Sequence, residues 1–417
     1  RRVSDPAASG GAFLAADAAG DRVTLAFAGD RVALYRRIGP DGGRASVTVD
    51  GRGHGTFEFY FPEERHQVPA VVDGLGDGAH VVTITVAGQA DAASTGRLVA
   101  LDAFAIPGPF DATAAQAAGI DRVNLYRDRV GVPRARGAAA IHLAAQAHAD
   151  YAVRNPGESH GETPGKPGYV GRGPTERVRY FGYPHGVWED MHFIGNPTAA
   201  IDGFMTTVYH RVPVIQYGLV EAGIGTARAG GNAADVLDMG GGGRGVAPAE
   251  RYVYAYPFDG QADVPPQWDG GEGPDPLPGQ PKPVGYPVSL HLAQPAARSA
   301  AGTAATPFGA AVAALRGQPW LGAGRAPWRG ALRGPFDAPA DGGWAVTTIA
   351  LADDRGSAVP AHVLHQGADP NAFLGPDVAF IIARQPMARG KVYRAHVAGT
   401  DSRGQPFDVR WSFTTAP

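Results

Sequence analysis

Apolar and polar residues alternate in short runs near the start of the chain, which is the pattern of half-buried β-strands. Val47 and Val49, for example, share one face of such a run, and Asp50-Gly51 supplies the turn that follows it. Strands at this spacing are typical of an antiparallel sandwich. The pattern predicts strands over residues 22–27, 32–36, 45–49, 56–61, 81–87 and 98–106.

Helical spacing of apolar residues replaces the strand pattern beyond residue 111. Asp111 or Thr113 is placed to cap a first helix, and a stripe rich in Ala predicts a second helix over about residues 138–154. His148 lies within this stripe. We expect it to be a hydrogen-bonded core residue, because a histidine among apolar residues is more often buried and paired than a ligand.

A third helix is predicted to begin after Asn196, because Asn is a preferred cap and Pro197 follows at the first helical position. Ile201 and Phe204 lie on its apolar side. At about 100° per residue, His210 falls on the opposite side of this helix, beside small polar residues. That position suits the wall of a cleft better than a core.

Strand signals return after residue 285 and predict strands over 288–292, 344–351, 359–365, 378–382, 392–397 and 409–413. The segment before them is rich in Pro and Gly and is interpreted as a linker. Residues 296–343 fit the strand pattern poorly and carry Trp320 and Trp328 among Arg, Ala and Gly. Trp and Arg are favoured at interface centres. The stretch is therefore an insertion that covers a neighbouring domain or partner chain, or else a surface loop.

Composition narrows the classes of partner. A chain of 417 residues predicts more than one domain, and a net charge of −3 provides no broad surface for nucleic acid or an anionic membrane. There is no cysteine, so disulfides, thiolate metal sites and a Cys nucleophile are excluded.

No run approaches the roughly 18 apolar residues of a membrane span, and the start of the chain lacks the apolar core of a signal peptide. If the protein is secreted, we expect this to be the processed chain.

The central segment contains four ordered runs that together resemble one known family. They are VNLYRDRVGVPRARGAAAIHLAAQAHADYAVRN, SHGETPGKPGYVGRGPTERVRYFGY, GVWED and TVYHRVPVIQYGLVEAGIGTA. They resemble the CAP superfamily, the cysteine-rich secretory, antigen 5 and pathogenesis-related type proteins, in a long bacterial form without cysteine. The resemblance covers about residues 112–257. It implies an α-β-α sandwich with a cleft that holds two histidines and two acidic residues and often a divalent metal.

Carried over by position, the resemblance assigns His160 and His210 as the cleft histidines and Glu189 as the first acid. The second acid is Glu162 or Glu176. Two imidazoles with carboxylates suit zinc or another first-row divalent ion, with the histidines as its ligands. Without a metal, the same residues would act as an acid–base pair or would brace the cleft as a structural polar cluster. In a metal-dependent hydrolase, Glu189 or Glu162 would be the base that acts on metal-bound water. Neither a Gly-x-Ser-x-Gly elbow nor a His-Glu-x-x-His motif occurs, so two common hydrolase signatures are missing.

The flanking segments resemble β modules of bacterial secreted proteins. The runs VTLAFAGDRVALYRRIGPDGGRASVTVDG, GLGDGAHVVTITVAG and GRLVALDAFAI resemble jelly-roll modules of the galactose-binding-like or carbohydrate-binding-like type. The run GKVYRAHVAGTDSRGQPFDVRWSFTT resembles the closing hairpin of bacterial Ig-like domains. Tyr35 and Tyr60 are candidates for an aromatic sugar-binding platform, whereas Phe57 and Phe59 are expected to share a face in the core.

These observations predict a multidomain protein: an all-β jelly-roll sandwich over 1–108, a CAP domain over 109–258, a Pro/Gly-rich linker over 259–285, and an Ig-like β sandwich over 286–417 with the insertion at about 296–343. The leading hypothesis for function is a secreted or cell-surface binding or scaffolding component of the cell envelope, which contacts glycan or cell-wall polymer. One alternative is a structural subunit of a surface layer or extracellular filament that self-associates through Trp320 and Trp328. Another is a metal-dependent hydrolase of peptide or wall polymer.

Overall fold

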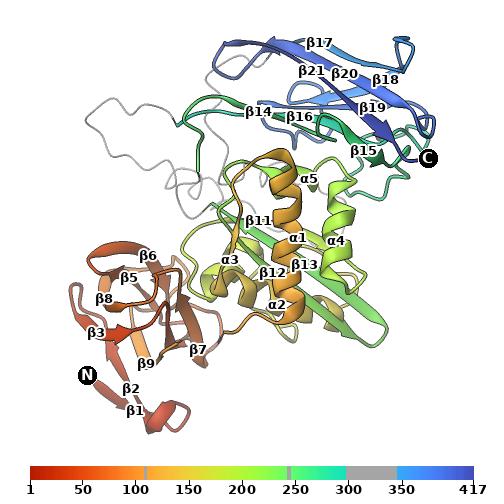
Figure 1. Ribbon diagram of the computed structural model, residues 1–417. Coiled ribbons are helices and arrows are strands. Elements are labelled where there is room, and N and C mark those ends of the chain that lie inside the picture. Colours follow the sequence, from red (N-terminus) through yellow and green to blue (C-terminus); the bar gives the residue numbers. More distant parts are fainter. Residues whose placement is uncertain (108–109, 242–245, 297–344) are drawn as a thin grey trace. The chain divides into compact units, whose positions relative to one another are not determined.

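The computed structural model describes residues 1–107, 110–241, 246–296 and 345–417 (Figure 1). Trp320 and Trp328 lie outside these residues, so their interface role stays a prediction. The described chain is rich in β-structure and forms several sheets. It divides into two compact units, the first made of Arg1–Arg122, Ala135–Ala200 and Val220–Gly243, and the second of Val123–Arg134, Ile201–Leu219 and Arg244–Pro417.

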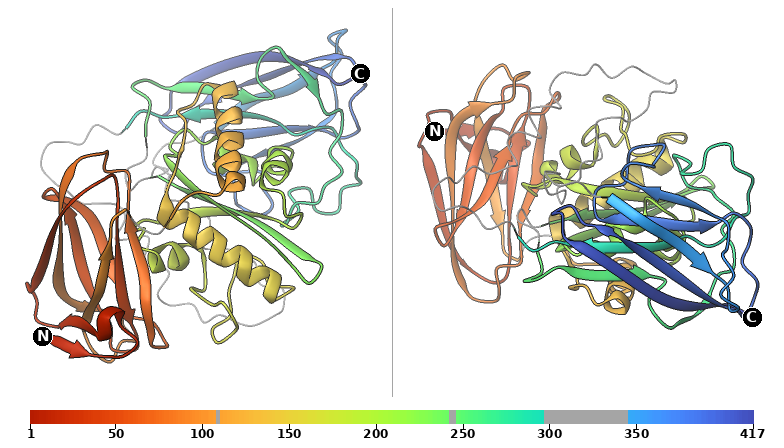
Figure 2. Two further views of the ribbon diagram at one scale, coloured as in Figure 1. Left: turned by 60° about the horizontal axis from the view of Figure 1, so that its bottom comes forward. Right: turned by 90° about the horizontal axis from the view of Figure 1, so that it is seen from above.

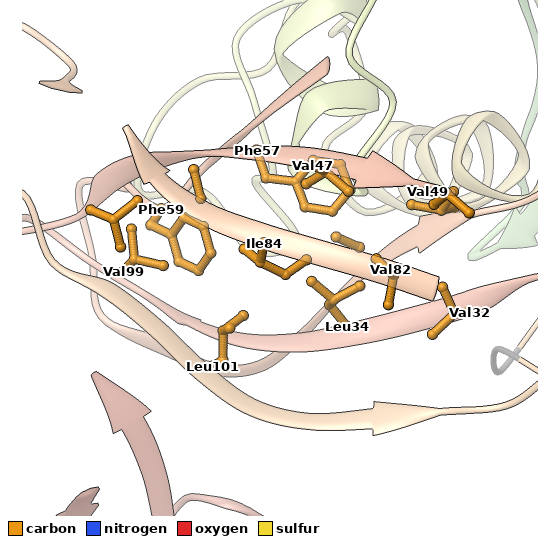
Figure 3. Close-up of a cluster of buried hydrophobic side chains, with 14 of the residues drawn as sticks. Val32, Leu34, Val47, Val49, Phe57, Phe59, Val82, Ile84, Val99 and Leu101 are labelled. Atoms are coloured by element: carbon orange, nitrogen blue, oxygen red, sulfur yellow. The ribbon is translucent and has the colours of Figure 1, made fainter. Parts of the chain in front are cut away.

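The first β segment is a sandwich of two antiparallel sheets, in the strand orders β1-β2-β9-β4-β7 and β3-β8-β5-β6 (Figure 2). Its strands are β1 (Arg2–Ser4), β2 (Ala12–Ala16), β3 (Arg22–Ala28), β4 (Val32–Ile38), β5 (Gly43–Val49), β6 (Arg52–Glu58), β7 (Arg65–Val72), β8 (Ala79–Ala90) and β9 (Val99–Ala105), with the short 3-10 helix η1 (Ser9–Gly11) between β1 and β2. Both sheets contribute to one apolar core, in which Phe57 and Phe59 are buried as predicted (Figure 3).

The central sheet has the strand order β10-β12-β13-β11. Its strands are β10 (Arg136–Gly137), β11 (Val187–His192), β12 (Glu221–Ala229) and β13 (Asn232–Gly240). Helix α2 (Ala139–Arg154) lies directly on β12 (Figure 1). A Cβ at Gly225 would lie 2.1 Å from the carbonyl oxygen of Ala145, so only glycine permits this approach.

Side chains of α2 also complete the hydrogen bonding of β12. Strand β10 pairs only with the first two residues of β12. Beyond that point, His142 Nδ1 accepts a hydrogen bond from the N–H of Ile224 at 2.9 Å. Gln146 both donates to the carbonyl of Thr226, at 3.0 Å, and accepts from its N–H, at 3.2 Å. The edge of the sheet is therefore closed by the same helix that covers its face.

Two helix starts agree with their sequence signals. Thr113 Oγ1 accepts the N–H of Gln116 at 3.2 Å while Gln116 Oε1 accepts the N–H of Thr113 at 3.0 Å, a reciprocal cap for α1 (Ala114–Val130). Asn196 Oδ1 accepts the N–H of Ala199 at 3.2 Å and caps α4 (Pro197–Met205). The remaining helices are α3 (Pro174–Tyr180) and α5 (Arg211–Ile215). None of the helices described combines the length and apolarity that a membrane crossing requires.

Helix α4 ends earlier than the apolar spacing predicted. The hydroxyl groups of Thr206 and Thr207 donate hydrogen bonds of 2.7 Å to the carbonyls of Gly203 and Phe204, respectively. The helix ends at Met205. Hydroxyl side chains that bond nearby carbonyls compete with the helical pattern. His210 consequently does not lie on the polar side of one long helix but at the residue directly before α5.

The second unit contains two further four-stranded sheets, in the orders β14-β16-β19-β18 and β15-β21-β20-β17. The strands are β14 (Tyr252–Tyr256), β15 (Gln261–Val264), β16 (Val288–Ala293), β17 (Ala345–Ala352), β18 (Ala361–His365), β19 (Val378–Ala383), β20 (Val392–Thr400) and β21 (Pro406–Thr415). Strand β14 lies within residues 109–258, the range predicted for the CAP domain, and it pairs with β16 of the following segment. Alternation identifies a strand and not the sheet that it joins.

The Pro/Gly-rich segment at 259–285 is built into the second unit. It contributes β15, and its Trp268 and Val284 are buried and exchange two backbone hydrogen bonds of 2.8 and 3.0 Å. The same segment places Glu272 in the interior, with consequences for His210 described below.

Candidate functional site

Five polar side chains are buried together in the first unit, beneath the partly exposed His160. We call them the buried charged cluster: His148 of α2, Glu162 of the following loop, Arg177 of α3, Glu189 of β11 and Asp238 of β13. Charged groups out of water are stable only when they are paired or neutralised. The contacts of each member therefore show what the cluster can do.

Glu189 orients the ring of His160. Its Oε1 lies 2.9 Å from His160 Nδ1, and its Oε2 accepts a hydrogen bond of 2.5 Å from Nη2 of Arg177. Arg177 also donates from Nη1 to the carbonyl of His160 at 3.1 Å. With Nδ1 donating to a carboxylate, Nε2 of His160 is the nitrogen with the free lone pair. Within the described chain Nε2 has no hydrogen-bond partner, and the side chain is 34% exposed, so it is open to a ligand.

Glu189 is ionised although it is buried. Burial by itself would raise the pKa of this carboxyl, but the charges of Arg177 and His148 and the hydrogen bond with His160 outweigh burial and hold the pKa well below its usual range. The side chain is thus a permanent negative charge behind the histidine.

Asp238 is the member of the cluster whose pKa is shifted upward. It lies directly opposite Glu189 in the antiparallel pairing of β13 with β11. Burial, followed by the negative charge of Glu189, raises its pKa well above the usual range. The pKa values of these two adjacent buried carboxyl groups are thereby shifted in opposite directions.

His148 and Glu162 brace the loop that carries His160. Nδ1 of His148 lies 3.0 Å from Oε1 of Glu162, and its Nε2 lies 2.9 Å from the carbonyl oxygen of Ser159. Both ring nitrogens of His148 therefore face hydrogen-bond acceptors. The other oxygen of Glu162 accepts the N–H groups of Val170 and Gly171, at 2.7 and 3.2 Å. His148 is therefore a hydrogen-bonded core residue, as predicted from the sequence.

Glu176, the other acid considered for the cleft, has a local contact. Its carboxylate accepts the N–H of Arg172 at 2.9 Å in the first turn of α3, and the residue is exposed. This is the position of a helix-capping acid.

His210 belongs to the second unit and has its own glutamate. Its Nδ1 lies 2.9 Å from Oε1 of Glu272, whose side chain is fully buried. The carboxylate of Glu272 also accepts the N–H groups of Val208, Tyr209 and His210, at 2.8, 2.6 and 3.0 Å. Phe204 stacks on the imidazole, with ring centroids 5.6 Å apart. The ring is thus held on one edge and one face.

The structure therefore joins His160 with Glu189 and His210 with Glu272, one pair in each unit. Sequence reasoning missed Glu272, which lies in a Gly-Gly-Glu-Gly stretch with no local mark of burial. It also missed Arg177, whose side chain is fully buried. Both act through contacts with residues far along the chain, so no spacing in the sequence points to them.

Metal binding would depend on the two imidazoles. Among the described residues, no group of three or more His, Asp or Glu side chains has the arrangement of a metal centre. Both oxygens of Glu189 are already bonded, as are those of Glu272. In the first unit, the donor that suits a divalent ion is Nε2 of His160, with Glu189 behind the ring as the orienting group. In the second unit, Glu272 orients the ring of His210 in the same way.

The sugar platform proposed from Tyr35 and Tyr60 stays a prediction. Tyr35 lies in β4, and Tyr60 follows β6. Both side chains are half-buried.

No protein-family model matches this chain, and no curated protein matches it either. Among solved structures, it is similar to an extracellular protein containing an SCP domain from Bacillus anthracis, at 15% identity over 39% of this chain and 52% of that one, with a TM-score of 0.24. A cysteine-rich secretory protein from Staphylococcus aureus is 11% identical over 48% of this chain and 67% of that one, with a TM-score of 0.23. The CBM36-1 domain of a multidomain xylanase from the hindgut metagenome of Trinervitermes trinervoides is 17% identical over 22% of this chain and 73% of that domain, with a TM-score of 0.17. Each likeness is partial, and the chain spans about half the length of the Bacillus anthracis protein.

Proposed function

We propose that this chain is a CAP-type binding protein of the cell surface or extracellular medium, in which His160 and His210 are each oriented to bind a divalent cation or a small ligand. One observation carries the proposal. Each of these two histidines, chosen from the sequence alone, has Nδ1 within 2.9 Å of a buried glutamate.

Such pairing prepares an imidazole to bind. A carboxylate that accepts the Nδ1 proton sets the tautomer, fixes the plane of the ring and makes Nε2 more basic. Histidines that ligate metals are commonly oriented in this way. A bound divalent ion would supply Lewis acidity at the cleft, while the residues of this chain hold and orient it.

The arrangement of the central sheet supports the CAP assignment. Helix α2 lies on one face of β12, at Gly223 and Gly225. The first part of α1 approaches β12 as well, since a Cβ at Gly119 would lie 2.9 Å from the side chain of Ile224. Successive residues of a strand face opposite sides. Helices on both faces of one sheet are what the α-β-α sandwich of this family requires.

We assign Glu272 as the second acid of the cleft, in place of Glu162 or Glu176. Glu162 pairs with His148 and two backbone N–H groups, and Glu176 contacts the start of α3. Glu272 contacts a cleft histidine directly. The polar set is then two histidine–glutamate pairs.

The β segments are assigned as a jelly-roll module and an Ig-like module that contact glycan or cell-wall polymer. The two facing sheets of β1–β9 support the first assignment. The two four-stranded sheets of the second unit support the other. Together with the cleft, they make the protein a binding or scaffolding component of the cell envelope.

Zinc titration of the whole chain tests the cleft. The unmodified protein is expected to bind zinc, followed by calorimetry and elemental analysis. His160→Ala and His210→Ala should each remove the zinc that is bound at the replaced histidine. His396→Ala is the matched control, because His396 forms a comparable pair with Asp408, at 3.1 Å, on β20 and β21. Equal zinc binding by all three variants would show that the ion is held elsewhere.

A further inference from the structure

Strand β18 is the last strand of its sheet and leaves one edge open. The backbone N–H of Arg384 donates a hydrogen bond to the carbonyl of Pro360, so these two residues form a hydrogen-bonded pair at the start of the antiparallel pairing of β18 with β19. In such a pairing every second residue of β18 bonds to β19. His362 therefore bonds to β19, whereas the N–H and C=O groups of Ala361 and Val363 point to the other side. No backbone group of the described chain bonds to these two residues there. An open strand edge is a template for another strand.

A cavity of about 340 Å³ lies against this edge. Val363 and Leu364 of β18 line it together with Pro276, Leu277 and Pro278 of the Pro/Gly-rich segment. A proline has no N–H, so Pro276 and Pro278 cannot supply donors to the open edge. The lining offers room for an apolar side chain while the backbone groups of β18 stay available.

The cavity lining also carries a cationic side chain, Arg384, and no acidic residue. Burial, followed by the charge of Arg384, lowers the pKa of His362, which also lines the cavity, and so favours its neutral form. Arg384 is exposed and forms no ion pair within the described residues. A carboxylate bound here would meet an unopposed guanidinium.

We propose that β18 binds an extended peptide of another protein as an added strand, with an apolar side chain of that peptide in the cavity and a carboxylate against Arg384. The backbone groups of Ala361 and Val363 supply the strand pairing, and the cavity and Arg384 supply selectivity. A second copy of this chain fits less well, because it would bring another Arg384 towards the guanidinium that is already there. This inference is independent of the proposed cleft.

The test uses the full chain and a fluorescein-labelled peptide, acetyl-Thr-Val-Glu-Val-Thr-Val-amide, in fluorescence anisotropy. Saturable binding is expected. Arg384→Glu should weaken it about tenfold or more, the effect of losing one charge-assisted hydrogen bond. Arg355→Glu, an equal change of charge at an exposed position of the same unit, should leave it unchanged. A peptide with Lys in place of Glu should bind less tightly than the original.

Two further measurements examine the edge itself. Val363→Pro removes an N–H on the open side and leaves the bonds of His362 and Leu364 to β19, as an edge strand tolerates. This variant should lose peptide binding. Amide exchange at Ala361 and Val363 should slow when the peptide is added to the unmodified chain, which gives a readout that does not depend on how the variant folds.

Three outcomes would overturn the proposal. The first is absence of saturable binding. The second is equal binding by the unmodified chain and Arg384→Glu, with no change in exchange at Ala361 and Val363. The third is a dimer in sedimentation that Val363→Pro abolishes and the peptide does not disturb, which would assign the edge to a second copy.

Discussion

Glu189 and Asp238 lie opposite each other on β11 and β13, and their pKa values are shifted in opposite directions, downward for Glu189 and upward for Asp238. The difference follows from their neighbours. Arg177 and His160 bond to Glu189, whereas the dominant influences on Asp238 are burial and the charge of Glu189 itself. The shifts favour a negative charge on Glu189, behind His160.

Removing that charge should destabilise the fold. Glu189→Gln leaves Arg177 buried without its ionised partner, and breaking a buried ion pair costs about 3 kcal/mol or more in the free energy of unfolding. Asp238→Asn exchanges a neutral carboxyl for a neutral amide of the same shape and should cost less than about 1 kcal/mol at pH 7. Urea unfolding of both variants measures the difference. Equal losses would show that Asp238 is ionised as well.

The cost of Glu189→Gln should depend on pH. Because the folded-state pKa of Glu189 is depressed, its contribution to stability is fully present above the unfolded value of about 4.3 and is lost as the pH falls through the lower folded pKa. The difference in unfolding free energy between the unmodified chain and Glu189→Gln should therefore be largest near pH 7 and shrink below about pH 4. A difference that stays constant down to pH 3 would contradict the assigned protonation state.

Glu272 should act on metal binding through His210. Glu272→Gln removes the carboxylate behind the ring, and loss of such an orienting group typically lowers metal affinity about 10–100-fold. His210→Ala should remove the zinc bound at this histidine outright, so the two variants are distinguishable in the same zinc titration. Glu272→Asp provides the matched control, since it keeps the charge and should recover part of the affinity. Unchanged affinity in Glu272→Gln would leave Glu272 with a structural role only, as the acceptor for the N–H groups of residues 208–210.

Because α2 lies so close to β12, adding one methyl group at Gly225 should lower the free energy of unfolding strongly. Gly225→Ala would place a Cβ 2.1 Å from the backbone carbonyl oxygen of Ala145, and neither backbone can give way without moving the helix. We expect a loss of about 3 kcal/mol in unfolding free energy. Gly53→Ala, in β6 of the same unit, meets nothing within 4 Å and should be nearly neutral. Thermal unfolding monitored by circular dichroism compares the two.

Much of the local structure could be predicted because its causes are local. The caps at Thr113 and Asn196 work within three residues of the helix start. The burial of Phe57 and Phe59 follows from strict alternation within one strand run, and the core position of His148 follows from its place in an apolar helical stripe. In each case the deciding contacts or pattern extend over one turn of helix or one strand.

Only the tertiary structure decided which acidic residue pairs with each histidine of the candidate site. Glu189 lies 29 residues after His160, and Glu272 lies 62 residues after His210, in a segment that the sequence presents as a linker. The early end of α4 was likewise mispredicted. A pattern along the chain records which residues prefer burial, but a charged side chain is buried only where a distant partner compensates it. The sequence by itself therefore determined the positions of most strands and of the helix starts, and only packing determined which carboxylate lies behind each of the two histidine rings.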